Sequence, residues 1–466
     1  MNLTELLDQS AARWPEKPAM IEGDFAISYK ELLAKISALS SQLQELQISP
    51  SSRIGLCFSN SIDYFALTFA LWRLNAVVVP IPIESTDEDF LTIAAAMELE
   101  GILSQKPRGN GANIRDNCHF TRAYPAPQAD NHGLNIAFIR FTSGTTSARK
   151  GVVLTHETIR DRIQAANKAL QITAADRVMW CLPMSHHFLI TIVLYLSQGA
   201  TIVMARHVLA RPFLEAVNRW SGTVLYAAPF HYAMLARDSS SLGSPSVRLA
   251  VSTTCALPED VARDFYQRFH QPLVQGLGII ELGLVSLNTA DPLKRSNSVG
   301  KVLPDFDVRI LSPDEEGCGE VAVRGPGLLD AYASPWMSKE QILRDGWFIT
   351  GDIGRLDKDG FLFLSGRKTA VINVAGRKVF PEEIEAVLNR HPAVRESRAY
   401  GRLHSHLGEI IEAELVLRRP ETNLDSVREF CRTHLASFKV PSSLHVVNAL
   451  PRTVVTGKIR RMAAVA

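Results

Sequence analysis

The stretch FTSGTTSARKG, residues 141–151, brings five hydroxyl side chains, two glycines and two basic residues into eleven positions. It directly follows the mostly apolar run 135–141. Glycine and small hydroxylated residues let a backbone bend close to a ligand and turn its N–H groups toward an anion, while a lysine adds a point charge. The stretch therefore predicts a phosphate-binding loop; the alternative is an ordinary surface loop between two elements.

Composition limits what kind of protein carries this loop. The chain has 466 residues, of which 46% are hydrophobic and 21% charged, which is typical of a globular protein with two or more domains. The formal net charge is only +2 and the clearest basic cluster is short, so nothing indicates a nucleic-acid partner. The six cysteines are far apart and form no Cys-x-x-Cys pair, which favours reduced thiols in the cytoplasm.

The N-terminal segment 1–17 reads as an amphipathic first helix, because it lacks the basic region and apolar core of a signal peptide. The most apolar stretches are 65–83 and 188–205, and polar residues or prolines interrupt both. Each falls short of the ~20 apolar residues that a membrane span needs. We expect them to be core elements, and no integral membrane segment.

Helix and strand patterns alternate through the first 300 residues. A capping box at Ser28 to Glu31 opens a helix that we expect to reach about Gln47, followed by a strand, a helix and a second strand. This βαβ rhythm predicts a largely parallel sheet covered on both faces. The expected strands are 53–58, 76–81, 178–182, 201–205, 223–227, 248–252 and 273–275, and the helix between the first two is 62–74.

The pattern changes after about Val299. Short alternating runs at 307–311, 319–324 and 361–365 predict an antiparallel, barrel-like region beside the parallel sheets. After Arg367 a unit of about 100 residues combines strands with two helices, which is large enough for a domain of its own. The predicted class is α/β, with a large N-terminal domain and a small α+β C-terminal domain. The polar segment 125–131 is the best candidate for a flexible surface segment.

The phosphate loop belongs to neither of two common types. The chain contains no G-x-x-x-x-G-K-[ST] and no G-x-G-x-x-G. The loop instead resembles that of the ANL superfamily, the adenylate-forming enzymes, and the resemblance spans nearly the whole chain. The other segments that carry it, in order, are 25–32 (FAISYKEL), 183–186 (PMSH), 319–321 (GEV), 324–325 (RG), 346–352 (GWFITGD), 366–367 (GR), 376 with 381–385 (G and PEEIE), 451–453 (PRT) and 457–459 (GKI).

The resemblance implies a two-step reaction. A carboxylic acid attacks the α-phosphate of Mg-ATP to give an acyl adenylate and pyrophosphate, and a thiol then takes the acyl group as a thioester. It also implies that residues 1–367 form the adenylation domain, which binds ATP and the acid. Residues 368–466 would form a mobile lid domain, which presents Lys458 for the first step and the Gly376 segment for the second.

The resemblance assigns the nucleotide site to residues of several segments. Phosphoryl chemistry depends mostly on positioning and charge neutralisation, which amide, hydroxyl and lysine donors provide. Asp352 would accept hydrogen bonds from the ribose hydroxyls, and Arg367 would donate to the same sugar. The implied ligands of the phosphates are Thr142, Ser143, Gly144, Thr145, Thr146 and Lys150, and Gly276 also belongs to the nucleotide site.

Three further residues match the reactive centre. Glu281 matches the glutamate that holds Mg²⁺, a cation that prefers oxygen ligands; the alternative is a structural ion pair. Lys458 matches the lysine that bridges the attacking carboxylate and the α-phosphate, where its charge lowers the barrier. His186 matches the histidine beside the substrate carboxylate. Weaker candidates for the acid pocket are His187, Phe188, Phe230 and Gly278.

The chain departs from the family pattern at four places. Leu277 replaces an aromatic residue that stacks on adenine, and Ile280 replaces a hydroxyl that bonds the α-phosphate. Thr369 stands at the usual position of an Asp or Lys hinge, and residues 147–149 differ from the usual Gly-x-Pro. Loss of one hydrogen bond to a charged group costs about 1.5–3 kcal/mol, which weakens an enzyme without necessarily abolishing its activity. A threonine is compatible with hinge rotation.

The acid and the thiol acceptor are only partly specified. Residues 177–214 contain no acidic side chain to pair with an ammonium group, which favours an aryl or fatty acid over an amino acid. Three hypotheses remain: a ligase that uses coenzyme A (CoA), a ligase that loads the phosphopantetheine of a separate carrier protein, and a non-catalytic member that binds a nucleotide or acid. The last follows from Leu277 and Ile280, and the retained Lys150, Glu281, Asp352, Arg367 and Lys458 argue against it.

Overall fold

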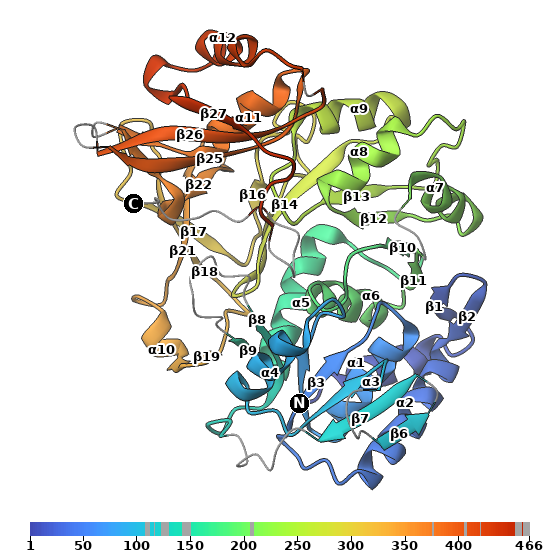
Figure 1. The fold of residues 1–466 in the computed structure, drawn as a ribbon. Helices are drawn as coiled ribbons and strands as arrows, with labels where there is room; N and C mark the ends of the chain where they lie inside the picture. Colours follow the sequence, from blue (N-terminus) through green and yellow to red (C-terminus); the bar gives the residue numbers. More distant parts are fainter. Residues whose placement is uncertain are drawn as a thin grey trace. The chain divides into compact units, whose positions relative to one another are not determined.

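The computed structural model describes residues 1–107, 112–115, 117–122, 130–141, 151–205, 209–374, 377–404, 408–419, 421–452 and 459 (Figure 1). Its described residues fall into two compact units. The first unit contains those within 1–141, 151–307 and 324–346, and the second those within 308–323 and 347–459. The boundary predicted from sequence, between residues 367 and 368, separates an adenylation domain from a mobile lid domain. It stays a prediction.

The first unit contains a sheet with the strand order β20-β19-β9-β8-β4-β3-β5-β7-β6. Strand β3 pairs in parallel with β4 and β5, and β8 pairs antiparallel with β9, so that Phe141 lies opposite Gly151. The ends of the predicted phosphate loop are therefore neighbours. The bounds are β3 (Arg53–Cys57), β4 (Val77–Pro80), β5 (Gly101–Ser104), β6 (Ala112–Arg115), β7 (Cys118–Arg122), β8 (Ile136–Phe141), β9 (Gly151–Thr155), β19 (Ala331–Ala333) and β20 (Trp336–Ser338).

A second sheet of the same unit has the order β16-β15-β14-β13-β12-β10-β11-β1-β2. Neighbouring strands pair in parallel along β1, β11, β10, β12, β13 and β14. Strand β15 pairs antiparallel with both β14 and β16. The bounds are β1 (Pro18–Glu22), β2 (Phe25–Ser28), β10 (Arg177–Trp180), β11 (Thr201–Met204), β12 (Val224–Ala227), β13 (Leu249–Ser252), β14 (Leu273–Ile279), β15 (Gly283–Leu287) and β16 (Gly300–Val302).

Helices cover both sheets with apolar faces. One core joins β10, β12 and β13 to helices α7, α8 and α9, which lie beside these strands in Figure 1. Another joins β3, β4 and β8 to α4. The bounds are α1 (Thr4–Arg13), α2 (Tyr29–Glu45), α3 (Ile62–Arg73), α4 (Asp87–Ala96), α5 (His156–Leu170), the π-helix η1 (Phe188–Ile192), α6 (Val193–Ser197), α7 (Ala210–Arg219), α8 (Pro229–Arg237), α9 (Glu259–Phe269) and α10 (Lys339–Ile342).

The second unit contains strands in the order β17-β18-β21-β22, in which β21 pairs antiparallel with β18 and β22, and a smaller α+β part. In the latter the order is β24-β23-β26-β25, β27 pairs with β26, and the core includes Ile384 of α11 and Val427 of α12. The bounds are β17 (Asp307–Leu311), β18 (Gly319–Arg324), β21 (Phe348–Leu356), β22 (Phe361–Arg367), η2 (Lys368–Ala370), β23 (Ile372–Val374), β24 (Arg377–Val379), α11 (Pro381–Arg390), β25 (Val394–His404), β26 (Gly408–Leu417), α12 (Leu424–His434), η3 (Ser437–Lys439) and β27 (Ser443–Val446).

This architecture confirms the predicted α/β class with large sheets and a smaller C-terminal α+β region. The capping box forms as expected: the Ser28 side chain accepts from the Glu31 backbone, and the Glu31 side chain accepts from the Ser28 backbone. The run 65–72 is buried in α3, as predicted for a core element. The predicted flexible segment lies mostly outside the described residues.

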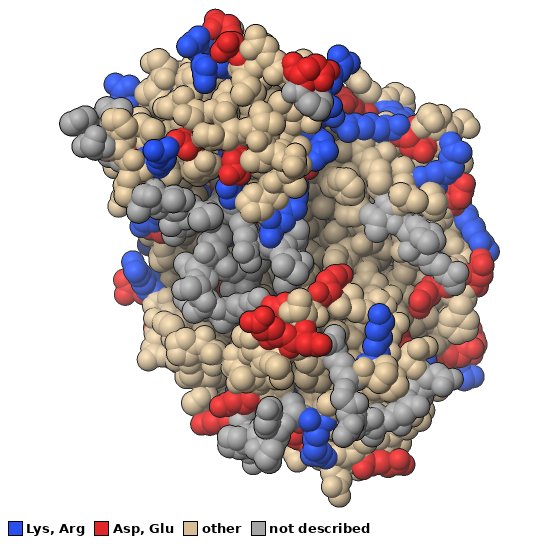
Figure 2. All heavy atoms as spheres, viewed as in Figure 1, with Lys and Arg blue, Asp and Glu red and all other residues tan. Residues whose placement is uncertain are grey.

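Charges of both signs are distributed over the visible face. Figure 2 shows Lys and Arg interspersed with Asp and Glu between larger uncharged areas. This agrees with a net charge of only +2 over the whole sequence. No helix among the described residues has the length and apolarity needed to cross a membrane.

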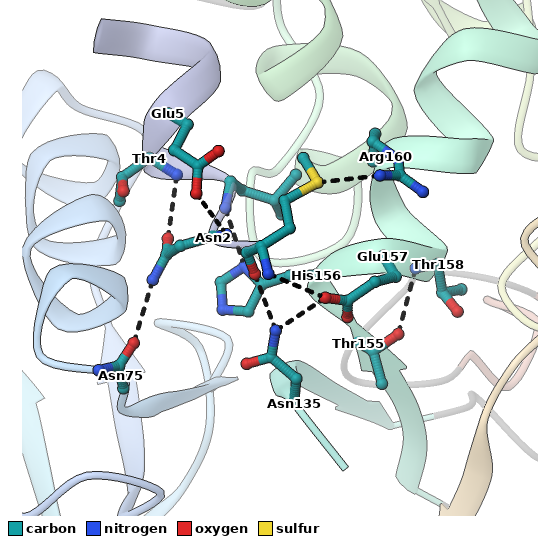
Figure 3. A network of polar contacts seen from close by, with 12 residues as sticks. Asn2, Thr4, Glu5, Asn75, Asn135, Thr155, His156, Glu157, Thr158 and Arg160 are labelled. Atoms are coloured by element: carbon teal, nitrogen blue, oxygen red, sulfur yellow. Dashed lines mark hydrogen bonds and ion pairs between the residues drawn. The ribbon is translucent and has the colours of Figure 1, made fainter.

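A buried histidine joins the first residues of the chain to helix α5 (Figure 3). The Leu3 amide donates to Nδ1 of His156 at 3.1 Å, and the Met1 amino group pairs with Glu157 at 3.4 Å. His156 is only 1% exposed, and burial lowers its pKa to about 4. The imidazole is therefore neutral at pH 7 and acts as a hydrogen-bond acceptor.

Candidate active site

Glu281 lies in the turn between strands β14 and β15. The two strands pair antiparallel, with Ile279 opposite Gly283, and the Leu282 amide donates to the Ile279 carbonyl at 3.0 Å. Gly283 has φ +89°, a left-handed conformation that favours glycine. The hairpin therefore presents Glu281 at its tip.

A buried arginine of helix α5 fixes this turn. Each nitrogen of the Arg162 guanidinium donates to a backbone carbonyl: Nη1 to Ile280 at 2.7 Å, Nη2 to Glu281 at 2.8 Å and Nε to Gly327 at 2.5 Å. Arg162 is 2% exposed, and burial lowers its pKa to about 10, so it stays charged. Because charge-assisted bonds are strong at low dielectric, Arg162 holds the backbone of Glu281 firmly.

Among the described residues, the side chain of Glu281 has one hydrogen-bond donor. Tyr332 donates its hydroxyl to Oε1 at 3.1 Å, and the other carboxylate oxygen accepts no hydrogen bond from the described residues. Burial, followed by the charge of Glu281, raises the pKa of Tyr332, so the phenol stays protonated. Mg²⁺ usually binds one or two carboxylates together with substrate phosphates and waters. A carboxylate with an oxygen available at a hairpin tip fits such a cation.

The His186 segment lies after strand β10 and is hydrogen-bonded to Asn60, which directly precedes the N-cap of helix α3. Asn60 accepts from the Met184 amide at 2.7 Å and donates to the Leu182 carbonyl at 2.8 Å. The amides of His186 and His187 both donate to the Pro183 carbonyl, at 3.0 and 3.1 Å. Both histidines are partly exposed. Their backbone is thus fixed at the carboxyl end of a parallel strand, where ligands usually bind in α/β sheets.

The four remaining predicted site residues of the first unit differ in their surroundings. Phe188 is 2% exposed and packs among aromatic rings, whereas Phe230 is 67% exposed and lines a surface hollow on α8. At Gly276, an added Cβ would lie 3.0 Å from Leu287 and 3.1 Å from the Ser286 carbonyl, so a side chain there would require these neighbours to shift by a few tenths of an ångström. Gly278 is exposed at the start of the hairpin. Phe188 and Phe230 do not share one pocket wall.

In the second unit, Asp352 and Arg367 face each other across strands β21 and β22. Arg367 Nε lies 2.7 Å from Asp352 Oδ1, and its Nη1 donates to the Thr350 carbonyl at 3.0 Å. Thr350 supports the pair, because its hydroxyl accepts from the Asp352 amide at 3.0 Å and donates to the Val321 carbonyl at 2.9 Å. The structure therefore brings together the two residues assigned to the ribose.

Eight predicted residues lie outside the described part of the chain. They are Thr142, Ser143, Gly144, Thr145, Thr146, Lys150, Gly376 and Lys458. Neighbouring elements are described: β8 and β9 flank the phosphate loop, β23 pairs with β24 on either side of Gly376, and Arg452 forms an isolated antiparallel bridge with Ile459. The roles of these eight residues stay predictions.

Comparison with known proteins gives the family. The AMP-binding enzyme model matches residues 7–333, and the model of the AMP-binding enzyme C-terminal domain matches residues 383–458.

The chain belongs to the AMP-binding enzyme family.

As an AMP-binding enzyme, the protein is a member of the adenylate-forming ANL superfamily and an AMP-forming acid–thiol ligase, which confirms the family and the enzyme class predicted from sequence. Among its relatives is the long-chain-fatty-acid–CoA ligase FadD13 of Mycobacterium tuberculosis, which is 28% identical over 98% of this chain and 97% of the relative. The oxalate–CoA ligase of Arabidopsis thaliana is also 28% identical, over 98% and 97%.

Solved structures of similar proteins agree with the fold. The o-succinylbenzoate CoA synthetase of Bacillus subtilis, in complex with its acyl-adenylate intermediate, has a TM-score of 0.87 and 23% identity, covering 98% of this chain and 96% of that chain. ATP-bound MatB from Rhodopseudomonas palustris has a TM-score of 0.85 and 23% identity, covering 99% and 97%. At this identity the likeness supports the α/β fold alone.

Sequence reasoning missed several residues around the site of this AMP-binding enzyme. Arg162, Tyr332 and Asn60 hold predicted residues in place, and none belongs to a quoted motif. Arg162 had a detectable signal: it lies four residues after Thr158 and four before Ala166, on the buried stripe of α5. A charged residue on such a stripe indicates a buried polar contact.

Proposed function

We propose that the protein activates an aryl or fatty acid with ATP and transfers the acyl group to coenzyme A. The observation that carries the proposal is Glu281, a carboxylate at a hairpin tip whose backbone is held by Arg162. One of its oxygens accepts no hydrogen bond from the described residues. A firmly held carboxylate costs little reorganisation when charge develops in a transition state. Mg²⁺, held there by Glu281, would neutralise charge on the phosphates of ATP.

The remaining residues take roles that the family resemblance implies. Asp352 would accept hydrogen bonds from the ribose hydroxyls, and Arg367 would orient Asp352 and donate to the same sugar. His186 would lie beside the acid carboxylate. Lys458 would bridge that carboxylate and the α-phosphate, and Lys150 with the hydroxyl-rich loop would hold the β- and γ-phosphates. Each role positions the substrates or compensates charge.

Coenzyme A as the acceptor is supported by the relatives. Those named above are CoA ligases, and the indoleacetate–CoA ligase of Aromatoleum aromaticum is 27% identical over 99% of this chain. The acids named for these relatives differ widely. The choice of an aryl or fatty acid as substrate is therefore supported by the absence of acidic residues in 177–214. A carrier protein is the alternative acceptor.

We also propose that 1–367 and 368–466 act as the adenylation domain and a mobile lid, with a hinge at Thr369. Thr369 belongs to the short helix η2 directly after β22. The six dispersed cysteines favour the cytoplasm as the compartment.

The test measures pyrophosphate release from Mg-ATP across aryl, medium-chain, long-chain and dicarboxylic acids. Lys458→Ala should abolish the release that the best acid supports. Lys439→Ala is a matched control, because Lys439 belongs to the same unit and pairs with Glu383 at 2.7 Å; it should leave the release unchanged.

The acceptor is then identified by supplying either CoA or a phosphopantetheinylated carrier protein and measuring the thioester. Thioester on CoA supports the proposal, and thioester on the carrier protein alone would replace it with the alternative. If no acid supports pyrophosphate release while ATP still binds, the protein is a non-catalytic binding member, and Leu277 and Ile280 are the first positions to revert to an aromatic residue and threonine.

A further inference from the structure

A short connection, residues 327–332, hydrogen-bonds to both the backbone and the side chain of Glu281. The Leu329 amide donates to the Glu281 carbonyl at 2.7 Å. The Tyr332 hydroxyl donates to Glu281 Oε1 at 3.1 Å. The first bond fixes the turn of the hairpin, as the bonds from the buried arginine do, and the second reaches the carboxylate itself.

Strand β19 holds Tyr332 from both sides. It pairs antiparallel with β9, where Tyr332 lies opposite Val152, and with β20, where Tyr332 lies opposite Met337. Tyr332 is only 8% exposed, and close packing restricts a buried ring to few rotamers. A fixed backbone and a buried ring therefore present the hydroxyl to Glu281.

Asp330 ties the same connection to helix α5. Its carboxylate accepts from the Thr155 amide at 2.8 Å and from the Thr158 hydroxyl at 2.9 Å, and its amide donates to the Val153 carbonyl at 3.0 Å. Thr155 is the N-cap residue of α5, and a carboxylate at this end of a helix is favoured by the helix dipole. Tyr332 is thus anchored to the helix whose Arg162 holds the Glu281 turn.

The hydrogen bond from Tyr332 makes the two carboxylate oxygens of Glu281 unequal. Oε1 accepts from the phenol, while Oε2 accepts no hydrogen bond from the described residues. A donor that is itself held in place restricts the rotation of the carboxylate, so that Oε2 keeps one direction. Loss of a group that hydrogen-bonds a metal ligand typically lowers metal affinity by about 10- to 100-fold. Oε2 is therefore the oxygen that Glu281 offers to a cation.

We propose that Tyr332 is a positioning residue that makes Glu281 a one-oxygen ligand and thereby favours Mg²⁺ over Ca²⁺. The proposal rests on the proposed function, since it takes Glu281 as the residue that would hold the cation of Mg-ATP. Mg²⁺ demands a near-octahedral arrangement of ligands, whereas Ca²⁺ takes more ligands in a flexible arrangement and often binds both oxygens of a carboxylate. A single oxygen in a fixed direction suits the smaller cation.

The test measures equilibrium binding of ATP to the full chain by titration calorimetry, with saturating Mg²⁺ and with saturating Ca²⁺. The readout is the ratio of the two affinities, which does not depend on turnover. Tyr332→Phe should weaken the binding of Mg-ATP about tenfold and that of Ca-ATP less, so that the ratio falls several-fold. An unchanged ratio would overturn the proposal.

Tyr29→Phe is the matched control, because it removes a buried and bonded phenol elsewhere in the first unit. The Tyr29 hydroxyl donates to the carbonyls of Leu196 and Ala200, at 3.1 and 2.7 Å. Its loss leaves both carbonyls without this donor, so the Tm should fall while the ratio of affinities stays that of the wild type. A ratio that falls equally in both variants would show that lost stability is the cause, and the proposal would fail.

A double-mutant cycle with Glu281→Gln tests whether Tyr332 acts through the carboxylate. In the Glu281→Gln background, Tyr332→Phe should cause no further change in the ratio. A change as large as that in the wild-type background would show that Tyr332 acts by another route, which would also overturn the proposal. Failure of the proposed function is distinguishable, because the wild type would then release no pyrophosphate with any acid, whatever the ratio of its affinities.

Discussion

Glu281 and Asp352, the two carboxylates assigned to the nucleotide site, are held by different means. The backbone of Glu281 is fixed by Arg162, a 2% exposed residue 119 positions earlier in the sequence. Asp352 is fixed by a strand ladder that places it opposite Arg367, whose side chain is 53% exposed. The first carboxylate depends on a distant buried cation, and the second depends on its own hairpin. Changes around Glu281 should therefore affect folding and function together, whereas changes around Asp352 should separate them.

The largest effect is expected for Arg162→Met. Removal of the guanidinium leaves three carbonyls without their donor, which should lower the free energy of unfolding by about 3–5 kcal/mol. Urea unfolding measures this directly. Arg162→Lys should recover part of the loss, because an ammonium can satisfy some of the carbonyls. A loss below about 1 kcal/mol would contradict the view that Glu281 depends on this arginine.

His156 extends the comparison to a second buried polar group of the first unit. Its pKa is lowered from 6.5 to about 4 by burial, so the unfolded chain binds a proton below pH 6.5 that the folded chain does not. The contribution of His156 to stability is therefore full above pH 6.5 and is lost as the pH falls toward 4. At about 1.4 kcal/mol for each pH unit, the loss amounts to roughly 3 kcal/mol.

His156→Gln is the control for that pH dependence, since its amide oxygen can still accept from Leu3 but does not titrate. The difference in unfolding free energy between wild type and His156→Gln should change by roughly 3 kcal/mol between pH 7 and pH 4. A difference that stays constant over this range would show that His156 takes up its proton while the protein is folded.

For the second carboxylate, whose partner Arg367 is exposed, Asp352→Asn should lower the efficiency of ATP use with little effect on stability. Loss of the charged acceptor should lower kcat/KM for ATP by roughly 10- to 100-fold, which corresponds to about 1.5–3 kcal/mol. The free energy of unfolding should change by less than about 1 kcal/mol, because an exposed Arg367 rehydrates easily. A stability loss as large as that of Arg162→Met would remove the distinction between the two carboxylates.

The smallest effect is expected for Lys368→Met. Lys368 pairs with Glu320 at 2.8 Å within the second unit, but its side chain is 61% exposed. Exposed ion pairs contribute about 0–1 kcal/mol and are screened by salt. Urea unfolding at low and high salt should therefore show a small difference that disappears at high salt. A larger, salt-independent loss would show that this pair is not a surface contact.

Much of the fold follows from local patterns in the sequence. The capping box at Ser28 depends on residues three positions apart, and the buried strand 53–57 is visible as an apolar run. The predicted site residues that the structure describes were found by motif. Asp352 and Arg367 meet because they lie opposite each other on the paired strands β21 and β22. The sequence alone does not show the register of this pairing.

Other features depend on contacts between distant segments, and local patterns do not encode these. The run after His187 forms a π-helix at 188–192, and the buried ring of Phe188 packs against the rings of Tyr64 and Phe138, which come from distant parts of the sequence. Arg140 is the single cation of strand β8, and Arg162 is the charged residue on the buried stripe of α5. Whether an arginine in such an element is exposed or bonded is decided by what packs against it, and residues 118 or more positions away supply those contacts for Arg162.

The β21–β22 hairpin has a turn whose length is tightly specified. Asp357 accepts from the amides of Asp359 and Phe361, both at 2.9 Å, and Gly360 has φ +81°. Because side chains alternate along a strand, an inserted residue that shifted the pairing register by one position would move Arg367 to the opposite face from Asp352. Homologous chains that keep both residues should therefore vary little in length between positions 353 and 366, and insertions should accumulate instead in exposed turns such as 313–317.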